Sequence, residues 1–134
     1  MTKLPDELAV SGSFMNKCYI VTIQGELKHE SLNKLHTHIV QTVYDTDVRG
    51  TILDFSSVTV FDTEIFDVFK KITQMIAIMG VAVVWIGLKP CVASALVDFN
   101  VDISSITVAM NLEHGLEMIK SNTFIADYKK FNQI

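Results

Sequence analysis

The stretch 52–66 constrains the fold of this chain most strongly, because it leads from an apolar strand through a hydroxyl-rich turn into a helix. The strand is apolar on both sides of its alternation except at Asp54, a pattern typical of a central strand that is covered on both faces. The helix is predicted to begin at Asp62-Thr63-Glu64. There the Asp62 carboxylate is placed to accept hydrogen bonds from first-turn N–H groups, which have no intrahelical partners.

Two residues of this stretch have open roles. Thr63 lies between two carboxylates in the first turn of a helix and is expected to be exposed. It is either an ordinary helix-start residue or the modifiable switch of a signalling domain. Asp54 is either a catalytic carboxylate or, as we favour, a brace that binds backbone N–H groups of the turn at Ser56-Ser57.

The aromatic residues beside Thr63 also allow two interpretations. Phe61 and Phe66 flank it, and the helix carries a wider apolar stripe than one buried face needs. The two rings are either partly exposed, as a partner-binding surface together with Asp62 and Glu64, or packed into the core. The sequence alone does not decide between these alternatives.

Strands and helices alternate along the chain, which predicts an α/β fold with about four helices packed on a mixed sheet of four to five strands. Apolar runs predict strands over 19–23, 51–55, 81–86 and 106–108. Helical spacing predicts helices over 28–44, from Thr63 to Gly80, from Pro90 to Asn100, and after Asn111 as N-cap. No internal repeat interrupts this pattern.

The predicted organisation is a single domain with short polar ends. A lead is expected over 1–12, the domain over 13–120 and a polar tail over 121–134. Within the first part, Ser11-Gly12-Ser13 predicts a turn, and Asn16-Lys17 predicts a hairpin that pairs the preceding residues with the strand over 19–23.

Composition limits the function classes. Hydrophobic residues make up 49% of the 134, so the chain is expected to fold around a core. A net charge of −4, from 15 acidic and 11 basic residues, provides no electrostatic footprint for nucleic acid or an anionic membrane. No N-terminal run has the length of a signal peptide, and the most apolar run, 75–88, is too short to cross a bilayer. A cytoplasmic location is therefore expected.

The sequence lacks the motifs of common catalytic and cofactor sites. It contains no G-x-G-x-x-G or G-x-x-x-x-G-K-[ST] phosphate loop, no H-E-x-x-H, no C-x-x-C and no G-x-S-x-G. The spacing of His29, His36 and His38 does not unite them around one metal, and we expect them to be solvated. Cys18 and Cys91 lie among apolar neighbours and are expected to be buried, reduced thiols. We expect no enzymatic activity, cofactor or metal.

Four motifs follow one another along the chain. They are Ile52-Leu53-Asp54 leading to Val60-Phe61-Asp62-Thr63, Met79-Gly80 before a strand, Gly87-Leu88-Lys89-Pro90-Cys91-Val92-Ala93, and Asn111-Leu112-Glu113-His114-Gly115-Leu116. As an ordered set over about residues 14–120, they resemble the STAS domain family (sulphate transporter and anti-sigma factor antagonist). The resemblance is closest to stressosome scaffold proteins of the RsbS type and to the C-terminal domains of the RsbR type.

The resemblance implies a non-enzymatic protein with a phosphorylation switch. The family's acceptor is a Ser or Thr that follows an Asp at the start of the helix after the third strand, and Asp62-Thr63 matches it. Such proteins bind an RsbT-like switch kinase with a GHKL-type ATP-binding fold and release it once they are phosphorylated. They also assemble with RsbR-like STAS proteins, so a homo- or hetero-oligomer is implied.

Three positions distinguish this chain within the resemblance. The acceptor is Thr, as is usual in RsbR-type proteins, whereas RsbS-type proteins usually have Ser. RsbR-type proteins can carry a second acceptor Thr in the helix after the G-[IL]-x-P turn, but the matching residue here is Ala95, with Ser94 beside it. Glu64 stands where the family often has a small or apolar residue.

Two other functions use the same fold. One is a small anti-anti-sigma factor that binds an anti-sigma kinase as a monomer, and assembly size would distinguish it from a stressosome scaffold. The other is a STAS module that binds a small ligand or nucleotide, which titration with nucleotides would reveal.

Overall fold

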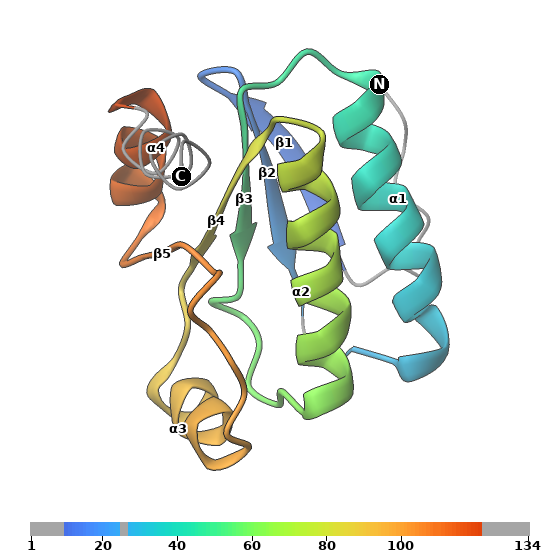
Figure 1. Ribbon diagram of the computed structural model, residues 1–134, viewed down its shortest axis with the longest axis vertical. Helices are drawn as coiled ribbons and strands as arrows, with labels where there is room; N and C mark the ends of the chain where they lie inside the picture. The colour runs from blue at the N-terminus through green and yellow to red at the C-terminus, as the bar shows by residue number, and fades with distance from the viewer. Residues whose placement is uncertain (1–9, 25–26, 122–134) are drawn as a thin grey trace, which may run out of the picture.

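A computed structural model describes residues 10–24 and 27–121, which form a five-stranded mixed sheet covered by helices (Figure 1). The strands lie side by side in sequence order: β1 (Val10–Met15), β2 (Cys18–Ile23), β3 (Gly50–Asp54), β4 (Ala82–Ile86) and β5 (Val108–Ala109). The helices are η1 (His29–Ser31), α1 (Leu32–Asp45), α2 (Thr63–Ile78), α3 (Pro90–Asp98) and α4 (Leu112–Ser121). β1 is antiparallel to β2, and the other neighbours are parallel. The predicted α/β class and mixed sheet are confirmed.

The two faces of the sheet are covered unequally. α1 and α2 lie side by side against one face, and α4 lies on the other (Figure 1). The core under α1 and α2 is the larger one and contains the aromatic residues Tyr19, Phe55, Phe61, Phe66, Phe69 and Trp85. The core under α4 consists of Cys18, Ile20, Ile52, Ala82, Val84, Ile86, Ala109 and Ile119. β3 and β4 supply residues to both cores, which explains their continuous apolar sequences.

α2 is held against the sheet by a buried polar contact within the aromatic core. Trp85 on β4 donates its indole N–H to Thr73 Oγ1 at 2.9 Å, and the Thr73 hydroxyl donates to the Phe69 carbonyl at 2.8 Å. The Phe69 ring itself packs against Phe55 and Trp85. Because every polar atom in this chain of contacts has a partner, the helix has a defined position on the sheet.

The β1–β2 hairpin confirms one prediction and corrects another. Asn16 and Lys17 form its two-residue turn, both with positive φ (52° and 63°), as the twist of paired strands requires. The turn expected at 11–13 is wrong, because these residues lie in β1 and pair with β2. The Tyr19 ring explains the glycine there: a Cβ on Gly12 would lie 2.6 Å from that ring.

The two cysteines differ in exposure. Cys18 is buried as expected, and burial raises the pKa of its thiol, partly offset by the charge of Arg49. The expected burial of Cys91 is wrong, because the residue is exposed in the first turn of α3. Both are free cysteines. α3 is a nine-residue helix that buries only Val92 and Leu96, so its remaining surface faces solvent.

Two further predictions concern the end of the chain. The strand expected over 106–108 is the two-residue β5, displaced toward the C-terminus. The tail expected from 121 lies outside the described residues, apart from its first position.

Within 10–24 and 27–121, no helix combines the length and apolar character needed to cross a membrane.

Candidate functional site

Three connections meet at one edge of the sheet. β2, β3 and β4 run parallel and therefore end at the same edge. From there the chain continues to η1 after β2, to α2 after β3 and to α3 after β4 (Figure 1). The carboxyl edge of a parallel sheet is where α/β proteins commonly place functional groups. Here it brings the start of α2 close to a segment more than thirty positions earlier in the chain, at His29.

The start of α2 has the geometry that its sequence predicts. Asp62 is the N-cap: its backbone is extended (φ −104°, ψ 179°) and its Oδ1 accepts from Ile65 N at 2.9 Å. Thr63 is the first residue of the helix and is exposed. Glu64 follows in the first turn, where a negative charge interacts favourably with the helix dipole. Thr63 is thus an exposed residue between two carboxylate residues in the sequence.

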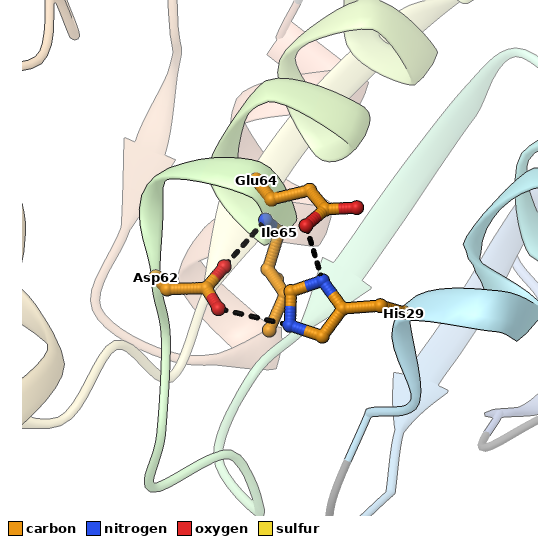
Figure 2. Close-up of polar contacts among 4 residues, drawn as sticks. All are labelled: His29, Asp62, Glu64 and Ile65. Carbon is orange, nitrogen blue, oxygen red and sulfur yellow. Dashed lines mark hydrogen bonds and ion pairs between the residues drawn. The ribbon is translucent and has the colours of Figure 1, made fainter.

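His29 connects these two carboxylates, as Figure 2 shows. Its Nε2 lies 3.0 Å from Asp62 Oδ2 and its Nδ1 lies 2.5 Å from Glu64 Oε2. The two oxygens of Asp62 therefore have different partners, the helix N–H of Ile65 and the imidazole of His29. His29 is a surface residue as expected, with 46% of its side chain exposed, but its two carboxylate partners were not expected.

No local sequence pattern shows the carboxylate partners of His29, because they lie more than thirty positions later in the chain. The signal lay in the sheet order: if β2 and β3 are parallel neighbours, the segments that follow them lie side by side. A single histidine after β2 then lies opposite the acidic start of α2. Among the described residues, no group of three His, Cys, Asp or Glu side chains has the arrangement of a metal site.

The turn between β3 and α2 is braced by Asp54. Its Oδ1 accepts from Ser56 N at 2.9 Å, while Ser57 is exposed beside it. Gly87, at the end of β4, has a positive φ of 75°, and a Cβ there would lie 2.8 Å from Asp54 Oδ1 and 2.9 Å from Ser56 N. The turns that lead to α2 and α3 are therefore in direct contact, and only a glycine fits between them.

Phe61 and Phe66 do not form an exposed partner surface. They retain 4% and 1% of their exposure, and both pack against the Trp85 side of the aromatic core. Phe61 lies against the rings of Phe55, Phe69 and Trp85. Val60 points outward instead and is 66% exposed. Of the two alternatives left open by the sequence, core packing is correct, and Val60 is the exposed apolar residue near Thr63.

α3 presents a different surface at the same edge. Its N-cap, Lys89, makes no side-chain cap hydrogen bond, and Pro90 occupies the first turn. Ser94 is exposed, and Ala95 is half-buried. After the helix, Asp102 accepts from both the backbone N–H and the hydroxyl of Ser104, at 3.0 and 2.6 Å.

The chain belongs to the STAS domain family, whose model matches residues 13–114. The RsbT co-antagonist protein RsbRB of Bacillus subtilis (strain 168) is 25% identical over 97 residues. That match covers 72% of this chain and 35% of the relative, so the chain spans about a third of the length of RsbRB.

Solved structures share the fold. An RsbS variant from Moorella thermoacetica has a TM-score of 0.74 at 24% identity, over 85% of this chain and 97% of that one. A chain from a structure of the stressosome, described as a signal integration and transduction hub, has a TM-score of 0.74 at 23% identity, over 84% and 98%. The unphosphorylated anti-sigma factor antagonist SpoIIAA has a TM-score of 0.68 at 12% identity, over 84% and 97%.

Proposed function

We propose that this protein is a non-enzymatic scaffold of a stressosome-type stress-signalling module, switched by phosphorylation of Thr63. The observation that carries the proposal is the exposure of Thr63 in the first turn of a capped helix. The resemblance to the STAS family supports this residue as the acceptor. The unmodified protein binds and sequesters an RsbT-like serine/threonine kinase in the cytoplasm, together with RsbR-like STAS proteins. The similarity to RsbRB and to the stressosome structure supports this assignment.

Electrostatics explains why phosphorylation releases a partner. A phosphate adds about −1.5 to −2 charge at neutral pH and brings three strongly hydrated oxygens. On Thr63 it lies between Asp62 and Glu64, so a partner that covers this surface must desolvate a dense group of negative charges. The apolar surface that such a partner contacts near the acceptor is Val60, because the Phe61 and Phe66 rings are buried. Phosphorylation of Thr63 therefore weakens kinase binding.

Intact mass spectrometry after incubation with ATP and the cognate RsbT-like kinase tests the acceptor. We expect the wild type to gain one phosphate and Thr63→Ala to gain none. Ser94→Ala is the matched control, because Ser94 is an exposed hydroxyl on α3, and it should gain one phosphate like the wild type. A phosphate on Thr63→Ala, or none on the wild type, would contradict the assignment.

Affinity and assembly size test the scaffold itself. The kinase should bind the unmodified protein more tightly than the phosphorylated form, and equal affinities would refute the switch. Mixed with RsbR-like partners, a stressosome scaffold forms very large particles. A species that stays small by light scattering would instead favour the second candidate, an anti-anti-sigma factor, for which the fold similarity to SpoIIAA is the supporting observation.

A further inference from the structure

Each ring nitrogen of His29 has a carboxylate partner. A neutral imidazole has one N–H donor and one acceptor nitrogen, whereas an imidazolium has two donors. Carboxylates only accept hydrogen bonds, and here one lies against each ring nitrogen, at 3.0 Å from Asp62 and 2.5 Å from Glu64. Only the imidazolium donates to both, so the bridged arrangement carries a positive charge between two negative ones.

We propose that His29 is the charge-compensating and positioning residue of the phosphoacceptor turn. This role rests on the function proposed above, in which Thr63 is phosphorylated. Without His29, the hydroxyl of Thr63 is flanked by two uncompensated carboxylates. With it, the three side chains of His29, Asp62 and Glu64 sum to a single negative charge.

Compensation matters because both the co-substrate and the product are anionic. The terminal phosphate of ATP must approach the Thr63 hydroxyl, and the product carries a phosphate dianion at the same place. Carboxylates that are not neutralised oppose both states. His29 reduces this repulsion by one unit charge, and in the bridged arrangement neither carboxylate rotates freely around the acceptor.

The bridge also ties two parts of the chain together. His29 belongs to η1, the segment that leaves β2, while Asp62 and Glu64 belong to the start of α2. Lys28 and Glu30 flank His29 in its own segment, and the charged groups that meet it from α2 are these two carboxylates. Because Asp62 also caps the helix through Ile65 N, movement of the ring is coupled to the first turn of α2.

Steady-state phosphorylation of the full chain by the RsbT-like kinase tests the role. We expect His29→Gln to lower kcat/KM at Thr63 by about two- to fivefold, the range of exposed ion pairs, and the deficit to shrink at high salt. Glu64→Gln in the His29→Gln background should restore the rate, because it removes one uncompensated charge. His38→Gln on α1 is the matched control and should phosphorylate like the wild type.

A merely structural role for His29 predicts a different result. In that case His29→Gln/Glu64→Gln would be as slow as His29→Gln or slower, because a second contact is lost, and the proposal would be overturned. An unchanged rate for His29→Gln would overturn it as well.

A second measurement tests the contact of His29 with Asp62 and Glu64 in the absence of the kinase. Nitrogen NMR of the unmodified protein should show ring-nitrogen signals of His29 that move in Glu64→Gln and in Asp62→Asn. Signals that move in neither variant would overturn the bridge. If these signals do move but wild-type Thr63 gains no phosphate, the proposed function fails while the contact stands, so the two failures are distinguishable.

Discussion

α2 and α3 follow neighbouring parallel strands and begin at the same edge of the sheet, yet they differ in almost every feature that a switch requires. α2 has 16 residues, six of them buried, and begins at a side-chain cap. α3 has nine residues, two of them buried, and begins without one. α2 has an exposed threonine, Thr63, in its first turn, whereas the first turn of α3, residues 90–93, contains no hydroxyl side chain.

The difference shows how a site on this fold combines exposure with rigidity. Thr63 is exposed, but the side of α2 that faces the sheet is fixed by the aromatic core and by the Trp85–Thr73 hydrogen bond. Both helices expose apolar side chains near their ends, Ile78 and Met79 at α2 and Val97 and Phe99 at α3. The difference lies in the buried side, which has six residues in α2 and two in α3. A phosphate on Thr63 would therefore add negative charge at a well-defined position, where a binding partner can recognise it.

The largest expected effect concerns the glycine between the two turns. Gly87→Ala should lower the free energy of unfolding by about 1–2 kcal/mol for the positive φ and by about 1–3 kcal/mol more for overpacking against Asp54 and Ser56. Urea denaturation measures the sum. Because Gly87 contacts the turn before α2, Gly87→Ala should shift the backbone NMR signals of the turn before α2 as well as those of the turn before α3.

Gly80→Ala is the matched control for backbone strain. Gly80 follows α2 with a φ of +85°, but a Cβ there meets nothing within 4 Å. It should therefore cost only the strain, about 1–2 kcal/mol. If Gly87→Ala and Gly80→Ala lower the free energy of unfolding equally, the turns before α2 and α3 are not in close steric contact.

Local patterns in the sequence predicted most of this architecture. The apolar runs of β3 and β4, the helical spacing of α1 and α2 and the N-cap at Asp62 all depend on residues close together in the chain. The same holds for the hairpin turn at Asn16-Lys17. Such features are set by backbone propensity, capping and periodicity, which a sequence displays directly.

The parts that the sequence left open or did not show depend on contacts between distant residues. Phe61 is buried because Phe55, Phe69 and Trp85 surround it, and a local stripe does not show this. His29 acquires its carboxylate partners only because β2 and β3 pair in parallel. The candidate site was thus half predictable: its exposed threonine and its N-cap come from one stretch, and the histidine that contacts the N-cap comes from another.

A smaller effect separates the two helix starts. Asp62→Ala removes the cap of α2 and should lower the free energy of unfolding by about 0.5–2 kcal/mol. Lys89→Ala at the start of α3 removes no cap hydrogen bond and should change it by less than about 0.5 kcal/mol. Both are measured by urea denaturation at neutral pH. If Lys89→Ala lowers the free energy of unfolding as much as Asp62→Ala does, the two helix starts do not differ in side-chain capping.

The smallest effect lies in the turn that follows α3. Hydrogen bonds from the Ser104 hydroxyl and backbone N–H, with a lesser contribution from the Lys70 charge, lower the pKa of the Asp102 carboxyl. Since the pKa is lower in the folded than in the unfolded chain, this contribution to stability is present above about pH 4 and is lost as the pH falls through the folded value.

Carbon NMR titration of the Asp102 carboxyl measures this shift directly. Ser104→Ala removes the hydroxyl, which is the larger of the two hydrogen-bond contributions, and should raise the pKa of Asp102 toward its ordinary value. Ser105→Ala, one residue further on, is the matched control and should leave the pKa of Asp102 as it is in the wild type. An equal pKa in wild type and Ser104→Ala would show that this turn, unlike the Asp62 cap of α2, is not held by its side-chain hydrogen bond in solution. The contrast between the two helices would then extend to the turn that follows α3.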